Sequence, residues 1–168
     1  IVRWVDAGAP QGDPKDMPPP KQFANDDVWG LAQHFGGPPD LIIKSPLYTM
    51  PAQALDQWYK PVVETGLTEP RWVRGIEIRP ATVKGRRITH HALARLQQGD
   101  PEASAADDGI GAGLFMEWAV GKQGEIMRPN SGKLMLPGSR IVFEVHYHAV
   151  GEEITDQVEL GIYLYPKG

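Results

Sequence analysis

The sequence predicts an all-β protein, an antiparallel jelly-roll sandwich that follows a proline-rich and mostly irregular N-terminal arm. Short apolar segments recur along the chain, and Gly, Pro, Asp or Asn separates them. Glycine (19) and proline (16) are frequent among the 168 residues, which favours short strands and turns over long helices. Segments at this spacing are typical of a sandwich and not of a parallel sheet with helical crossovers.

The composition argues against several function classes. The formal net charge is −4 and charges of both signs are mixed along the chain, so no basic stripe indicates a nucleic-acid or membrane partner. The apolar runs are short, and we therefore expect no transmembrane segment. The absence of cysteine excludes disulfides, thiolate metal ligands and a covalently attached c-type haem within these residues.

The N-terminal arm is predicted to span residues 1–38. Its first residues, IVRWVDAG (Ile1–Gly8), favour a short helix that ends at Gly8. The proline-rich sequence that follows favours an extended chain, in which only Asp26–His34 is expected to form a helical turn. The arm is either a linker or a segment that docks on its own domain or on a partner through three aromatic residues, Phe23, Trp29 and Phe35.

Residues 39–168 are predicted to form the sandwich. The acidic, polar stretch from 97 to 112 is expected to be a long surface loop between two strands. The predicted strands are Leu41–Ile43, Leu47–Met50, Trp58–Val63, Trp72–Ile78, Arg87–Leu93, Leu114–Val120, Ile141–His148 and Val158–Tyr165.

The stretch LPGSRIVFEVHYH (Leu136–His148) is a turn followed by a strand with strict alternation. One face suits a core, whereas the other carries two imidazoles and a carboxylate, which is an unusual exterior for a sandwich. The apolar face consists of Ile141, Phe143, Val145 and Tyr147, and the second face of Val142, Glu144, His146 and His148.

A second pair of histidines, His90 and His91, lies upstream in RRITHHALARL. If the sheet brings both stretches together, three or four imidazoles converge, a donor set that suits copper, zinc, nickel or iron. His146 and His148 would lie about 7 Å apart along one strand. Adjacent residues of a regular strand point to opposite faces, so His90 and His91 can face one ion only if the backbone bulges there.

The same residues also have ordinary structural interpretations. An isolated histidine is usually a surface or hydrogen-bonded residue, and we interpret His34 in this way. Glu144 would either orient an imidazole or point outward into solvent. Three methionines would serve either as thioether ligands of a cuprous ion or as core residues: Met116, Met127 and Met135.

Five features in this order together carry a resemblance: the run W-V-x-x-x-E-x-R-P (Trp72–Pro80), the pair His90-His91, the Pro-Gly-Ser turn, V-H-Y (Val145–Tyr147), and the trailing Gly151, Thr155, Asp156 and Gly161. Residues 39–168 resemble the first domain of the copper type II, ascorbate-dependent monooxygenases, the group of peptidylglycine α-hydroxylating and dopamine β-monooxygenases and their bacterial relatives. The resemblance implies a jelly-roll sandwich whose copper ligands are His90, His91 and His146. His148 would be an additional ligand or have no role, zinc is the alternative metal, and the site could also be empty.

The first residues, IVRWVDAGAPQGDP, resemble the closing helix of a small c-type cytochrome domain, which implies a haem domain upstream and a periplasmic location. The family hydroxylates its substrate at a second copper, held by His-x-His and a Met in a second domain that these residues lack. We therefore expect no enzyme activity from this chain alone.

The expected function is that of a non-catalytic periplasmic subunit, an interaction module of a larger membrane-associated electron-transfer complex, respiratory or photosynthetic. The first alternative is a copper-binding redox module that stores or passes one electron beside a c-type cytochrome. The second is a monooxygenase half whose second copper domain is missing.

Overall fold

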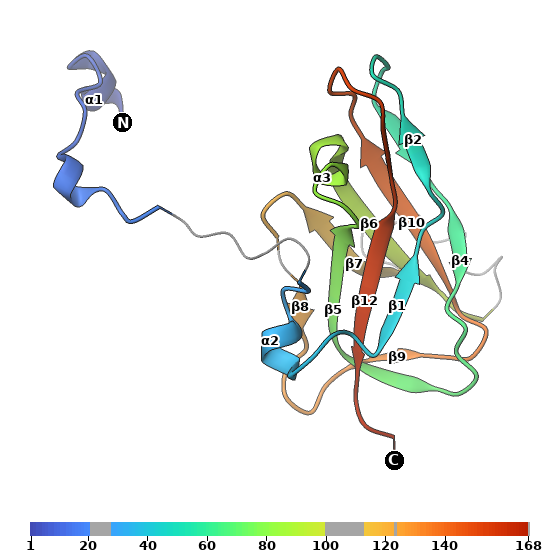
Figure 1. Ribbon diagram of the computed structural model, residues 1–168. Helices are drawn as coiled ribbons and strands as arrows, with labels where there is room; N and C mark the ends of the chain where they lie inside the picture. The colour runs from blue at the N-terminus through green and yellow to red at the C-terminus, as the bar shows by residue number, and fades with distance from the viewer. Residues whose placement is uncertain (21–27, 100–112, 123, 168) are drawn as a thin grey trace.

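A computed structural model describes residues 1–20, 28–99, 113–122 and 124–167 of the chain. Two antiparallel five-stranded sheets pack against each other (Figure 1). One continuous cluster of buried apolar side chains joins the two sheets. The predicted all-β antiparallel sandwich is thus confirmed, while the jelly-roll connectivity stays a prediction.

Each sheet combines strands that are distant in the sequence. The first sheet has the order β1 (Leu41–Lys44), β12 (Val158–Leu164), β5 (Arg71–Pro80) and β8 (Glu125–Ile126), and β9 (Lys133–Met135) also pairs with β5. The second sheet has the order β3 (Gln57–Tyr59), β10 (Arg140–Tyr147), β6 (Thr89–Gln97) and β7 (Leu114–Ala119), and β4 (Val62–Glu64) also pairs with β10.

The remaining elements are short. Strands β2 (Tyr48–Met50) and β11 (Ile154–Asp156) form a two-stranded ribbon. The helices are α1 (Val2–Asp6), the 3-10 turn η1 (Pro14–Asp16), α2 (Ala32–Phe35) and α3 (Gly85–Ile88). Within the described part of the chain, no helix has the length and apolar character needed to cross a bilayer.

The alternation predicted for β10 is confirmed. Ile141, Phe143, Val145 and Tyr147 are all fully buried between the sheets. Their neighbours Val142, Glu144 and His146 are partly exposed on the outer face of the second sheet. This strand therefore anchors the core with one face and presents histidine with the other.

Two strand predictions are corrected. The segment Trp58–Val63 is split into β3 and β4, because Pro61 has no N–H to donate to the ladder, although its carbonyl accepts from the Phe143 N–H. The segment Arg87–Leu93 is not a strand from its start, since Arg87 belongs to α3 and β6 begins only at Thr89. Strand β6 then runs on to Gln97, the first residue of the predicted loop, whose residues 100–112 lie outside the described residues.

The outer face of the first sheet is covered by residues 28–40, which we call the covering segment. The Trp29 ring lies 4.0 Å from the Arg79 guanidinium, and Phe35 stacks on Tyr163 with ring centroids 4.4 Å apart. Trp29 and Phe35 thus dock on their own domain, whereas Phe23 lies outside the described residues. This cover explains why every residue of β12 is buried.

The covering segment is also held by polar contacts and by small residues beneath it. The Glu77 carboxylate accepts hydrogen bonds from the backbone N–H groups of Gly30 (2.7 Å) and Leu31 (2.9 Å). A Cβ at Gly161 would lie 2.6 Å from the Trp29 ring, so only glycine lets the indole approach the sheet. The covering segment is therefore packed as part of the sandwich.

The first residues of the arm behave differently. Helix α1 ends before Gly8, whose φ of 80° is the left-handed conformation that ends helices, as the sequence predicts. Every residue from Ile1 to Pro20 is exposed. Of the helical turn predicted for Asp26–His34, residues 26 and 27 lie outside the described residues, and the helix in the rest is α2, from Ala32 to Phe35.

Replacing Gly161 by alanine should destabilise the sandwich, because the new methyl group overlaps the Trp29 ring and Pro39. We expect a loss of about 1–3 kcal/mol in the free energy of unfolding, measured by urea denaturation followed by tryptophan fluorescence. Gly12→Ala is the matched control, since a Cβ there meets nothing within 4 Å. Equal stability of the two variants would contradict tight packing of the covering segment.

Candidate metal centre

Three imidazoles converge on the outer face of the second sheet. The Nδ1 atom of His90 lies 3.1 Å from Nδ1 of His146 and 3.1 Å from Nδ1 of His91. One ring nitrogen from each of the three residues lies within 4.8 Å of the others. The sequence prediction that the two histidine stretches meet is therefore correct in geometry.

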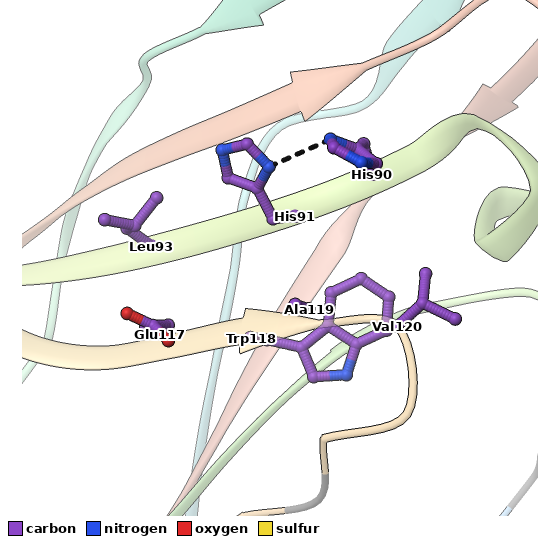
Figure 2. A pocket seen from close by; sticks show the side chains of 7 residues that line it. All are labelled: His90, His91, Leu93, Glu117, Trp118, Ala119 and Val120. Atoms are coloured by element: carbon purple, nitrogen blue, oxygen red, sulfur yellow. Dashed lines mark hydrogen bonds between the residues drawn. The ribbon is translucent and has the colours of Figure 1, made fainter. Parts of the chain in front are cut away.

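A β-bulge makes this convergence possible. In the ladder between β6 and β10, His91 pairs with His146 but Thr89 pairs with Tyr147, so His90 is an extra residue with no partner on β10. The register shift turns the His90 side chain toward the face that already carries His91. Figure 2 shows the two rings pointing toward one another from adjacent positions of β6.

The bulge lies next to a well-anchored helical turn. The Thr89 hydroxyl donates to the Gly85 carbonyl oxygen (2.8 Å), and the His148 N–H donates to the Ile88 carbonyl oxygen (2.8 Å). The buried Asp156 carboxylate accepts from the Thr82 hydroxyl at 2.9 Å. Helix α3 is thus tied to His148, directly after β10, and through Thr82 to Asp156 of β11, which fixes the backbone from which His90 projects.

Trp58 on β3 forms one wall of the site. Its indole stacks on the His146 imidazole, with ring centroids 4.7 Å apart and planes inclined by 5°, and meets the His91 ring edge-on at 5.0 Å. Trp58 is half exposed, so it covers two of the three imidazoles while its outer side remains in solvent. The indole therefore shields the site on the β3 side.

A pocket opens on the opposite, β7 side of the histidines (Figure 2). It has a volume of about 460 Å³ and contains His90 and His91 in its wall. Its other walls are mainly apolar, with one carboxylate: Leu93, Glu117, Trp118, Ala119 and Val120. His90 and His91 are thus accessible from the β7 side, whereas Trp58 covers His146 and one edge of His91 on the β3 side.

Asp56 links His146 to His148. His146 Nε2 lies 3.0 Å from one carboxylate oxygen of Asp56, and His148 Nδ1 lies 2.6 Å from the other. The hydrogen bond with His148 and, to a lesser degree, that with His146 lower the pKa of the Asp56 carboxyl group. His148 therefore contacts Asp56 and is not one of the three converging imidazoles.

The arrangement fits a metal ion. One proton can bridge two nitrogen atoms, whereas a metal ion can accept lone pairs from all three imidazoles at once. Two nitrogens bound to one ion at about 2.0–2.1 Å lie roughly 2.9–3.4 Å apart for angles near 90–110°. The two separations that involve His90, 3.1 Å each, fall within that range, and ring nitrogens of all three residues lie within 4.8 Å of one another. The donor set of three imidazoles suits copper and zinc.

The other candidates from the sequence have structural roles. Glu144 is paired with Arg95 and Lys60 and neither orients an imidazole nor points freely into solvent. Met116 and Met135 are buried in the core, and Met127 packs against it. His34 is exposed and contacts Phe35 edge-on, outside the site.

Sequence reasoning missed Asp56 and Trp58. Strand β3 is only three residues long and carries no alternation of its own. A signal was nevertheless present, because Asp56-x-Trp58 matches His146-x-His148 across an antiparallel pair: Trp58 faces His146 directly.

No family model, no curated protein and no solved structure gives a significant match to the chain. The resemblance to the copper monooxygenases therefore stays a prediction that rests on the sequence features described above.

The histidines should make the stability of the metal-free protein depend on pH. Burial, and then the charges of His146 and His90, lower the pKa of His91 below its usual value. As the pH falls below about 6.5, the unfolded chain takes up a proton that folded His91 resists, so the folded state loses stability. Urea denaturation with a chelator present should show this loss between pH 7.5 and 5, and a smaller loss in His91→Gln. Equal pH dependence of both proteins would contradict the shift.

Proposed function

We propose that this chain is a copper-binding redox module that stores or passes one electron. The observation that carries the proposal is the convergence of three Nδ1 atoms at a β-bulge on an exposed sheet face. Copper bound there would exchange single electrons by alternating between its cuprous and cupric states. Zinc is the alternative metal, because three imidazoles bind either ion.

The protein groups have distinct tasks in this proposal. His90, His91 and His146 would supply the metal ligands. Trp58 excludes water from the β3 side, and the pocket along β7 leaves the other side accessible. Among the described residues, these histidines are the one cluster of three or more His, Asp or Glu side chains close enough together to hold a metal ion. We therefore propose electron exchange for these residues and not a hydroxylation that needs a second copper.

The test is copper stoichiometry in the purified chain. We expect about one bound copper per chain, and loss of stoichiometric binding in His90→Ala, His91→Ala and His146→Ala, because two imidazoles hold the ion much less tightly than three. Elemental analysis after dialysis gives the stoichiometry, and electron paramagnetic resonance of the cupric form shows nitrogen coordination.

His34→Ala is the matched control, since this histidine lies outside the site. If all three site variants bound as much copper as the native chain, His90, His91 and His146 would be ruled out as its ligands. If the native chain bound zinc but no copper, the proposed redox function would be ruled out, and the site would be a zinc centre.

A second function, as an interaction module, is favoured by a separate observation. Helix α1 and the residue before it expose four large apolar side chains: Ile1, Val2, Trp4 and Val5. Exposed apolar side chains that lie next to one another are typical of a contact surface for another protein. We propose that residues 1–20 contact a protein partner of a larger electron-transfer complex, with a c-type cytochrome in the periplasm as the expected partner.

Deleting residues 1–20 should release the chain from such a complex and leave the sandwich folded. This deletion keeps Trp29 and Phe35, which pack on the first sheet, so loss of association cannot be attributed to an uncovered core. Co-purification from the native source measures association, and urea denaturation measures folding. If the complex retained the shortened chain in the same amount as the native chain, this second function would be contradicted.

A further inference from the structure

Asp56 contacts the candidate metal centre through the outer nitrogen, Nε2, of His146. It immediately precedes β3 and lies on the same face of the chain as Trp58, two residues later. Both residues meet His146: the indole stacks on the ring, and the carboxylate reaches Nε2 at 3.0 Å. The His146 ring is therefore fixed in its plane and in its rotation.

The hydrogen bond also decides which nitrogen of His146 carries the proton. An ionised carboxylate only accepts hydrogen bonds, so His146 donates from Nε2 to Asp56. In the neutral imidazole, Nδ1 then has a free lone pair, and this atom faces His90 Nδ1. Asp56 thus prepares His146 for metal binding before any ion arrives.

His148 holds the carboxylate in place. It donates from Nδ1 to the second oxygen of Asp56 at 2.6 Å, so each carboxylate oxygen has one imidazole partner. The loop before Asp56 is tied down as well, because the Gly151 N–H donates to the Ala52 carbonyl oxygen (3.0 Å). Both oxygens of the Asp56 carboxylate are therefore held by imidazoles, although its side chain is half exposed.

We propose that Asp56 is a positioning residue of the metal centre, which fixes the tautomer and the orientation of His146, and that His148 clamps its carboxylate. This inference rests on the proposed metal centre. It assigns a role to His-x-His different from joint ligation: His146 binds the metal, and His148 supports the residue that aligns it. A carboxylate hydrogen-bonded to a ligand imidazole makes that imidazole a stronger donor, which favours the cupric over the cuprous state.

The test measures three properties of the full chain loaded with copper(II): the dissociation constant by chelator competition, the electron paramagnetic resonance spectrum, and the reduction potential. We expect Asp56→Ala to bind copper about 10–100-fold more weakly. At full loading, it should show altered copper hyperfine splitting and a higher reduction potential. Asp56→Asn should lie between Asp56→Ala and the native chain, because its amide oxygen can still accept one hydrogen bond.

Two further variants separate the hydrogen bond from other effects. Glu117→Gln removes a negative charge that also acts on His91 but makes no hydrogen bond to an imidazole among the described residues. It should change affinity and potential far less than Asp56→Ala. His148→Ala should weaken binding less than Asp56→Ala and should not raise the potential, because Asp56 keeps its hydrogen bond to His146.

The outcomes are distinguishable. The inference would be overturned if both Asp56 variants kept the copper affinity, the spectrum and the reduction potential of the native chain. It would also be overturned if Glu117→Gln had an effect equal to that of Asp56→Ala, because Asp56 would then act only through its negative charge. If the native chain binds copper and His90→Ala does not, these results concern Asp56 alone. If the native chain binds no copper, the metal centre itself fails, and the inference fails with it.

Discussion

The candidate site depends on one irregularity in the ladder between β6 and β10. Without the extra residue at His90, adjacent histidines would point to opposite faces, and one imidazole would enter the core. The bulge leaves the core side of β10 undisturbed, because its four apolar residues remain fully buried. A single extra residue thus brings His90 to the outer face without changing the packing of the core. Bulges near functional sites often redirect a side chain in this way.

The two sheets treat their outer faces differently. The first sheet is covered by the chain itself, through Trp29 and Phe35 above glycines and a buried carboxylate, Glu77. The second sheet carries the histidines and has only partial shielding from Trp58. The first sheet is therefore covered on both faces, whereas the second sheet leaves its outer face open at the histidine cluster.

Much of the fold could be predicted from the sequence, because alternation in β10 and the frequent turn residues are local signals. The convergence of His90 and His146 could be expected only by assuming that their strands pair in one sheet. A bulge was needed for His90 and His91 to face one ion, but no residue near His91 indicates one in the sequence. The contact of Asp56 with His146 was missed, and the docking of Trp29 stayed one of two alternatives, because both depend on contacts between segments distant in the sequence.

The site joins segments 56 residues apart, so it exists only when β6 and β10 are paired. An ion that binds these histidines would bind the folded chain and not the unfolded one, and would therefore add to the stability of the sandwich. At a thousandfold excess over its dissociation constant, the gain is about 4 kcal/mol, a large fraction of the roughly 5–15 kcal/mol by which folded proteins are usually stable. Metal supply would then regulate how long this protein survives proteolysis, independently of any electron that it carries.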